Sequence, residues 1–271
     1  MSAPTAQTPT TFRLERPREG VVLLTLDRPE KYNAMTATMF AELETAAREL
    51  DREEGLRVVI VTGAGKAFCA GYDLADAEKL AGLGALGMLD LQESAARALT
   101  GIRSLRVPVI AAVNGAAAGG GLALALAADI RLASPRAKFN AAFVKIGLSA
   151  GDLGTSWLLP RLVGPAAAAE FAYTAGMWDA ARAEETGLVN RVVPEDELLP
   201  AALAMAEQIC ANSPGGVQLS KRALHANMEV TSYAAALELE NRGQALLTRT
   251  SDMSEALEAF RAGRAPSFRG N

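Results

Sequence analysis

The stretches VVIVTGAGKAFCAGYDL (residues 58–74) and VIAAVNGAAAGGGLALALAA (residues 109–128) share one pattern. In each, a short apolar segment of strand-forming character runs through a glycine-rich turn toward a helix. The pattern predicts two buried strands, and each following turn can aim a backbone N–H at one shared point. Two such donors would form an oxyanion hole, which stabilises negative charge as it develops on a carbonyl oxygen.

The flanking segments continue the alternation of strands and helices. Further strands are expected at residues 21–27, 130–133 and 187–194, because these runs are short, apolar and bounded by turn residues. Apolar residues recur at helical spacing over residues 36–53, and an alanine- and leucine-rich stretch covers residues 76–105. The expected fold class is therefore α/β.

After Pro194 the pattern becomes wholly helical, with helices expected at residues 195–211, 214–227, 231–249 and 251–261. We expect residues 1–11 to be a disordered tail, residues 12–197 to form the core, and residues 198–271 to form a helical oligomerisation region. The apolar faces of those helices need cover, which the core or another subunit can provide.

Composition excludes several classes of partner. The 271 residues include 27 basic and 31 acidic side chains, so the chain lacks the basic field that holds nucleic acid. Cys69 and Cys210 are the two cysteines, which is typical of a reducing compartment. The start MSAPTAQTPT has no basic, apolar leader pattern, so we expect a cytoplasmic protein.

Residues 108–128 carry no charge and approach the length of a membrane span. Asn114 and the glycines between 115 and 121 would interrupt such a span. A buried strand, turn and helix explain the composition better, and we expect no membrane association.

Two nucleotide-binding motifs fail on their spacing. GAGK at residues 63–66 lacks the first glycine of a phosphate loop, and Ala67 replaces the hydroxyl that would hold magnesium. The glycines at 115–121 lack the dinucleotide spacing, so a nicotinamide oxidoreductase is the weaker alternative; it would bind NAD and not coenzyme A. No cluster of histidine, cysteine and carboxylates has metal-ligand spacing.

Three motifs together closely resemble the enoyl-CoA hydratase/isomerase (crotonase) superfamily: DRPEKYNAM at 27–35, AFCAGYDL at 67–74 and AVNGAAAGGG at 112–121. The resemblance implies a spiral of ββα units with a C-terminal all-α region, assembled as trimers or dimers of trimers. It also implies an acyl-CoA thioester substrate whose enolate is held by the N–H groups of Tyr72 and Gly120.

The same resemblance implies a coenzyme A site along the turn at 28–33 and the loop at 70–74, with coenzyme A entering as part of the substrate and no separate cofactor. The residues implied are Arg28, Lys31, Tyr32, Ala70, Asp73, Leu74, Arg264 and Arg269. Lys31 is the candidate phosphate partner, and the two C-terminal arginines could come from a neighbouring subunit. For each basic residue a solvated surface charge is the alternative, and for Asp73 it is a structural role.

Hydratases of this superfamily use two glutamates, whose positions here read Ala123 and Phe143. The remaining nearby acid is Asp152, whose placement resembles that of a proton-carrying aspartate in dienoyl-CoA isomerases and of a nucleophile in a dehalogenase. Its alternative role is the N-cap of a helix beginning near Gly154. Tyr72 and Trp157 are candidates for the acyl pocket, and His225 is expected at the surface or an interface.

A single proton-carrying acid suits double-bond isomerisation better than hydration, which must activate water and also protonate carbon. We therefore expect isomerase-like chemistry. The alternatives are hydration without the glutamate pair, another crotonase reaction such as hydrolysis, dehalogenation or decarboxylation, and a catalytically silent acyl-CoA-binding protein.

Overall fold

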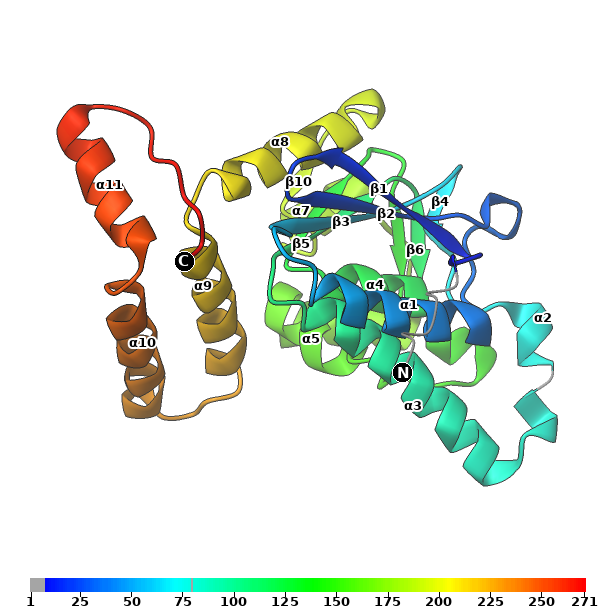
Figure 1. Cartoon of the computed structure of the whole chain (residues 1–271). Helices are drawn as coiled ribbons and strands as arrows, with labels where there is room; N and C mark the ends of the chain where they lie inside the picture. Colours follow the sequence, from blue (N-terminus) through cyan, green and yellow to red (C-terminus); the bar gives the residue numbers. More distant parts are fainter. Residues whose placement is uncertain (1–7, 79) are drawn as a thin grey trace, which may run out of the picture.

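The computed structural model describes residues 8–78 and 80–271, in which two sheets are surrounded by helices (Figure 1). The larger sheet has the strand order β1-β2-β3-β5-β7-β10, with β1 antiparallel to β2 and the following pairs parallel. Its strands are β1 (Phe12–Arg18), β2 (Val21–Leu26), β3 (Val58–Gly63), β5 (Val109–Val113), β7 (Ile130–Ala133) and β10 (Arg191–Val192).

A second sheet of four short strands lies beside the first, in the order β4-β6-β8-β9. Its strands are β4 (Ala67–Cys69), β6 (Ala116–Ala118), β8 (Lys138–Asn140) and β9 (Trp178–Asp179). Strands β3, β5 and β7 are each followed by a strand of this second sheet, which gives the chain its spiral path.

The two glycine-rich segments differ from the direct strand-to-helix connections that the sequence predicts. In each crossing a short strand, β4 or β6, lies between the long strand and the helix. The sequence did not predict these strands, because three residues are too few to show a repeating pattern. The first crossing then enters α2 (Leu74–Ala77) and the second enters α4 (Gly120–Ala127).

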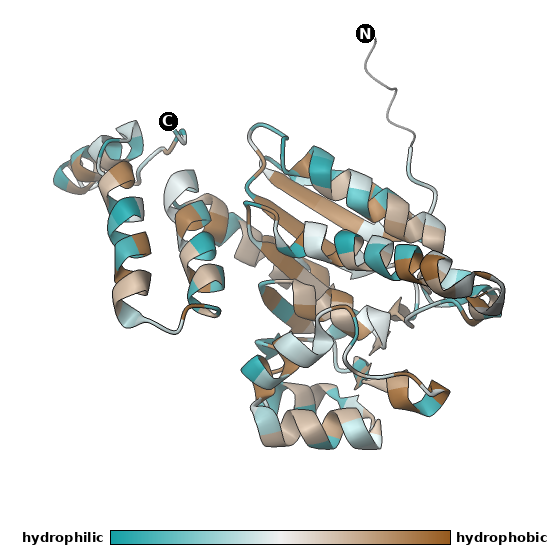
Figure 2. Ribbon diagram, turned by 90° about the horizontal axis from the view of Figure 1, so that it is seen from below, coloured by the Kyte–Doolittle hydropathy of each residue, from teal (hydrophilic) through white to brown (hydrophobic). Residues whose placement is uncertain are grey.

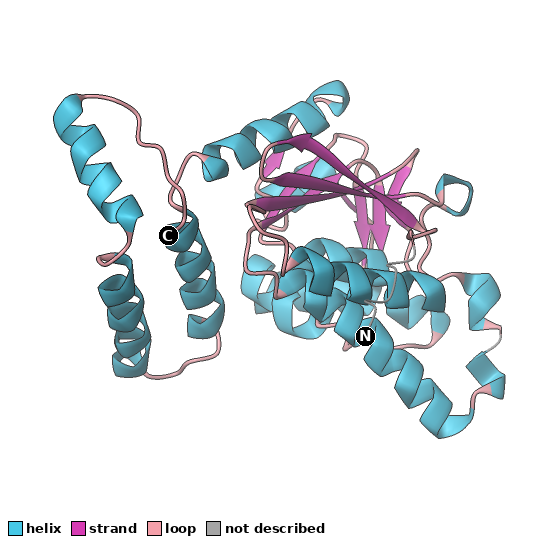
Figure 3. Cartoon of the chain, in the orientation of Figure 1, coloured by secondary structure: helices cyan, strands magenta, loops and turns pink. Residues whose placement is uncertain are grey.

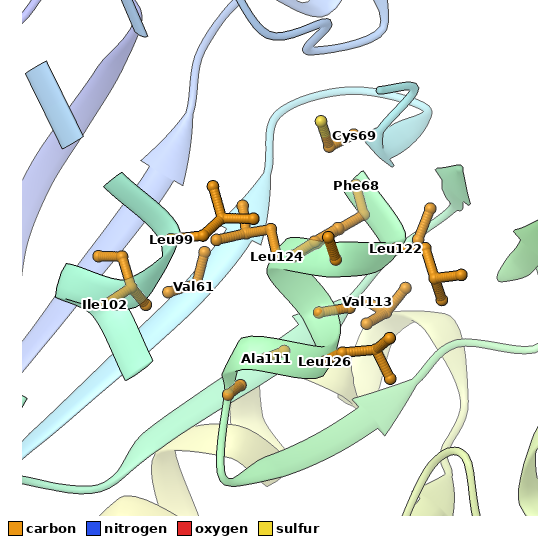
Figure 4. Close-up of a cluster of buried hydrophobic side chains, with 14 of the residues drawn as sticks. Val61, Phe68, Cys69, Leu99, Ile102, Ala111, Val113, Leu122, Leu124 and Leu126 are labelled. Atoms are coloured by element: carbon orange, nitrogen blue, oxygen red, sulfur yellow. The ribbon is translucent and has the colours of Figure 1, made fainter. Parts of the chain in front are cut away.

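Helices cover both faces of the larger sheet, and this explains why its strands are apolar throughout. Val59 and Val61 of β3 belong to the main core, with α1 (Ala37–Leu50), α3 (Gly84–Arg103) and the wholly buried α4. Figure 4 shows Val61 among buried side chains of α3 and α4 that include Leu99 and Leu124. Val58 and Ile60 face the other way, against α8 (Leu198–Cys210). In Figure 2 these strands appear as an apolar layer between helices.

The remaining elements connect these layers. The helices are α5 (Thr155–Val163), α6 (Pro165–Thr174) and α7 (Ala180–Glu185), and the 3₁₀ turns are η1 (Pro29–Lys31), η2 (Leu80–Gly82), η3 (Ala142–Ile146) and η4 (Glu195–Glu197).

The C-terminal helices α9 (Pro214–Asn227), α10 (Tyr233–Leu247) and α11 (Ser251–Ala262) form an arm that stands apart from the sheets (Figure 3). Sequence placed the start of this region at residue 198. Because α8 packs on the larger sheet, the structural break falls after Cys210 instead.

The arm is tied to the core by a charged cluster at Asp129. The ammonium of Lys221 lies 2.8 Å from one carboxylate oxygen of Asp129, and Nε2 of His225 lies 2.8 Å from the other. Lys221 also donates to the carbonyl of Val107 at 2.8 Å. His225 is thus a partly buried tie within the chain and not simply a surface residue.

The N-terminal end differs from the tail expected at residues 1–11. Thr10 and Thr11 both donate hydrogen bonds to the carboxylate of Glu42 on α1, and Thr11 is buried. The anchored chain therefore begins before Phe12, while residues 1–7 lie outside the described part.

The uncharged stretch 108–128 is divided among β5, β6 and α4. Within residues 8–78 and 80–271, no helix is long and apolar enough to cross a membrane.

Candidate active site

The two glycine-rich turns meet at Gly71 and Gly120. Gly71 has φ +97°, and a Cβ atom there would lie 2.7 Å from the carbonyl oxygen of Ala118 and 3.5 Å from the nitrogen of Gly120. A Cβ atom on Gly121 would lie 2.0 Å from the carbonyl oxygen of Cys69. Glycine is required here because the two backbones touch, and this contact brings the two expected N–H donors together.

Local hydrogen bonds fix the backbone on each side of the meeting point. Gly119 donates its N–H to the carbonyl of Asn140 at 3.0 Å, which leaves Gly120 as the first residue of α4. The N–H groups of a helix's first turn have no partner within the helix and lie at its positive end. On the other side, Met35 is hydrogen-bonded to both neighbours of Tyr72. The N–H of Met35 donates to the carbonyl of Gly71 at 2.7 Å, and the carbonyl of Met35 accepts from the N–H of Asp73 at 2.8 Å.

Tyr72 and Gly120 line one cavity of about 260 Å³, together with Asp152. Most of the other lining side chains are apolar and come from α1, α2, η2, α3, η3 and the loops before α1 and after η3: Met35, Phe40, Leu74, Ala77, Leu80, Met88, Leu91, Ala95, Ala142, Phe143, Ile146, Leu148 and Leu153. The ring of Tyr72 stacks on Phe40 with centroids 6.1 Å apart. Among the described lining residues, Asp152 is the one carboxylate.

Asp152 is not the N-cap of α5, which was the alternative role considered for it. The N-cap of α5 is Gly154, without a side-chain hydrogen bond. The carboxylate of Asp152 instead accepts a hydrogen bond from the side-chain amide of Gln92 on α3. Burial raises the pKa of Asp152, and hydrogen bonds from Gln92 and the Leu153 backbone lower it without cancelling that rise.

Sequence reasoning missed Gln92. It lies within the stretch 76–105, which was interpreted only as an apolar helix. Gln92 directly follows Leu91, which also lines the cavity. A polar side chain at this point of an otherwise apolar helix face was the one local sign that Gln92 had a polar partner. The contact itself joins residues 60 positions apart, so no local pattern contains it.

Arg28 and Asp73, both expected at the coenzyme site, are engaged with each other. The Arg28 guanidinium lies 3.0 Å from the Asp73 carboxylate and donates to the carbonyl of Ala34. Burial raises the pKa of Asp73, but Arg28 and the N–H of Ala75 hold it below its usual value. The ion pair joins the two loops of the site, and the Asp73 carboxylate also caps α2 by accepting from the N–H of Ala75, so Asp73 has the structural role considered for it.

The other expected coenzyme residues divide into two groups. Ala70 and Leu74 line the cavity, and Lys31 and Tyr32 are exposed on the adjacent η1 turn. Arg264 and Arg269 are not among the described residues that line this cavity, because they line a separate hollow formed by α11 and the C-terminal segment. Figure 1 shows that segment returning from α11 to the start of α9. Arg264 is paired there with Glu255, and the backbone N–H of Arg269 donates to Asp252.

Three further residues complete the comparison with the sequence. Phe143 lines the cavity, whereas Ala123 is buried within α4. Trp157 packs against the guanidinium of Arg161, 3.8 Å from the ring centroid, and is not among the described lining residues. In the described part of the chain, no group of three or more histidine, cysteine, aspartate or glutamate residues is placed to hold a metal ion.

Known proteins resemble this chain over most of its length. The 1,2-epoxyphenylacetyl-CoA isomerase of Escherichia coli (strain K12) is 37% identical over 261 residues, covering 96% of this chain and 98% of that protein. A crystal structure of enoyl-CoA hydratase from Bacillus anthracis is 33% identical with a TM-score of 0.91, and the match covers 97% and 100% of the two chains. A monofunctional enoyl-CoA isomerase from M. smegmatis is 40% identical with a TM-score of 0.73, covering 84% and 98%.

The family described as Enoyl-CoA hydratase/isomerase matches residues 16–271. That span includes both glycine turns, the cavity and the C-terminal arm, and the structural similarity establishes the crotonase fold. The chain therefore belongs to the enoyl-CoA hydratase/isomerase family and is an enzyme that processes acyl-CoA thioesters.

Proposed function

We propose that this enzyme isomerises the double bond of an enoyl-CoA thioester by carrying one proton on Asp152. The observation that carries the proposal is the cavity, where the one described carboxylate shares an apolar space with the N–H donors of Tyr72 and Gly120. Electrostatic stabilisation of the enolate and a single acid–base group are the two requirements of such a shift.

The reaction begins with the thioester oxygen bound to the N–H groups of Tyr72 and Gly120. The carboxylate of Asp152 removes a proton from C2 of a 3-enoyl-CoA, and the electron pair spreads onto the thioester oxygen as a dienolate. Protonated Asp152 then returns the proton to C4, which forms the 2-enoyl-CoA and restores the carboxylate. The raised pKa of Asp152 favours this cycle, because it makes the carboxylate a better proton acceptor.

The names of the relatives include both isomerases and hydratases, so the choice between the two reactions rests on the site. Of the three proteins compared above, one is named an enoyl-CoA isomerase, one a 1,2-epoxyphenylacetyl-CoA isomerase and one an enoyl-CoA hydratase. Further relatives at 37–40% identity are named probable enoyl-CoA hydratases. Hydration would need a second acid–base group. Phe143 lines the cavity at one of the two positions where the resemblance to hydratases implies a glutamate, and phenylalanine cannot transfer a proton. Hydration without a glutamate pair, and the other crotonase reactions, are therefore the alternatives.

For binding, we propose that coenzyme A enters with the substrate and lies along η1 and the loop at 70–74, with Lys31 near a phosphate. No separate cofactor is required by the proton transfer above. The arm presents exposed apolar side chains, including Leu224, Leu246 and Phe260, which support assembly into trimers or dimers of trimers. Such an assembly could bring Arg264 and Arg269 to a neighbour's site. We propose a cytoplasmic location.

The test measures turnover of crotonyl-CoA, 3-enoyl-CoA and dienoyl-CoA esters by absorbance and mass spectrometry. Wild-type protein, Asp152→Asn and the exposed control Asp196→Asn are compared. Isomerisation without hydration, lost in Asp152→Asn and kept in the control, is the expected result.

Two results would contradict the proposal. Hydration that survives in Asp152→Asn would remove Asp152 from the chemistry. Absence of turnover on every ester, with coenzyme A binding retained in calorimetry, would favour a silent acyl-CoA-binding protein.

A further inference from the structure

Gln92 brings a neutral hydrogen-bond donor to the acid of the cavity. It lies on α3, four residues after Met88 and three before Ala95, and both of these also line the cavity. Residues at this spacing share one helix face. The side chain of Gln92 therefore reaches the cavity from α3, and its amide nitrogen donates to Oδ1 of Asp152 on the loop before α5.

The chemistry of the pair determines what Gln92 can do. An ionised carboxylate only accepts hydrogen bonds, so the amide must present its N–H. The amide is neutral at every relevant pH, and its bond to the charged carboxylate is stronger than to the neutral acid. Gln92 holds Oδ1 and the Leu153 N–H also donates to the carboxylate, so these two bonds together fix the orientation in which the carboxylate exchanges a proton with substrate.

We propose that Gln92 is a positioning residue that orients the carboxylate of Asp152 for proton transfer, and this rests on the proposed function. A cationic partner in this place would hold the carboxylate in its ionised form and weaken it as a base. A neutral amide fixes the orientation while the proton can still be gained and lost. In this role Gln92 acts on the reaction through Asp152.

The surroundings allow this role to be isolated. Among the described lining residues, the titratable side chains are Tyr72 and Asp152. Gln92 is largely exposed on its other side, so its replacement should leave the fold intact. The next residue, Glu93, pairs with Arg97 along α3 at 3.6 Å and supplies a matched control.

The first test compares Gln92→Met, Gln92→Glu and the control Glu93→Gln. Methionine keeps the size of glutamine and removes the donor, so kcat should fall on the order of tenfold while KM changes little. The acidic limb of the kcat/KM profile should move to higher pH, because the lost hydrogen bond favoured the ionised form. Gln92→Glu should move this limb further, since a second carboxylate repels the first.

The second test does not depend on turnover. Infrared titration of the Asp152 carboxyl, identified by its loss in Asp152→Asn, should give a higher pKa in Gln92→Met than in wild type and no change in Glu93→Gln. An unmoved carboxyl pKa, or an unmoved pH profile with wild-type kcat, would overturn the role of Gln92. If wild-type protein turns over no ester while the infrared shift appears, the proposed reaction fails and the contact with Asp152 stands.

Discussion

Asp129 and Asp152 are both withdrawn from solvent, yet their pKa values shift in opposite directions. Asp129 lies where the helical arm meets the core. Burial raises its pKa, but the hydrogen bond from His225 and the charge of Lys221, with further hydrogen bonds, outweigh that effect and lower it. Asp152 lies in the cavity, where burial raises its pKa and two neutral donors do not compensate.

The difference shows that the charge of its partners decides what a partly buried carboxylate can do. Asp129 receives hydrogen bonds from Lys221, His225 and the N–H of Val109, each at 2.8 Å. Its ionised form is stabilised, so it serves as a fixed tie. Asp152 is met by an amide and a backbone N–H, which orient it without stabilising its charge strongly enough to prevent protonation.

The largest effect is expected when each aspartate is replaced by asparagine and turnover is measured. Asp152→Asn should lower kcat by about 10²- to 10⁴-fold, because a positioned acid–base group typically contributes that much. Asp129→Asn should keep kcat within a few-fold per folded molecule, because its partners lie outside the cavity. Steady-state kinetics with active-site titration would measure both. Equal losses of kcat in the two variants would show that Asp152 has no greater part in the reaction than Asp129.

The next effect concerns the stability of the arm-to-core tie. Lys221→Met should lower the free energy of unfolding by about 3 kcal/mol, because it leaves the Asp129 carboxylate with an incomplete set of partners. Lys138→Met, at an exposed position of β8, should change it little. Urea unfolding followed by circular dichroism would measure the difference. A Lys221→Met protein as stable as the control would show that the cluster contributes no net stability.

The smallest effect is a pH dependence of opposite sign at the two sites. The lowered pKa of Asp129 means that its stabilisation is present above the unfolded pKa, about 3.9, and is lost as pH falls through the folded pKa. The raised pKa of Asp152 means that stability is lost as pH rises through its folded pKa. Asp129→Asn should therefore be less stable than wild type at pH 7, and Asp152→Asn slightly more stable.

The Asp152 difference should shrink as the pH falls from 7 toward about 4, whereas the Asp129 difference should shrink only below about 4, because its folded pKa lies below the unfolded value. Chemical unfolding at a series of pH values would measure them. Differences of the same sign in the two variants would mean that burial, and not the kind of partner, controls both aspartates.

Sequence by itself determined the elements whose physical cause is local. The span of β7 matches the strand predicted at residues 130–133, and β5 is the apolar start of the stretch 109–128, because buried parallel strands are apolar runs bounded by turn residues. The helix at residues 214–227 was equally readable, since Pro214 follows a serine that caps it. The glycine turns were predicted from residues that permit close backbone contact.

Tertiary structure alone decided which side chains meet. The short strands β4 and β6 exist because each pairs with a distant neighbour, and three residues carry no period of their own. His225 reaches Asp129 across 96 positions, and Gln92 reaches Asp152 across 60. Local sequence records backbone preference and burial, whereas the state of a buried carboxylate depends on the charge of partners that only folding brings to it.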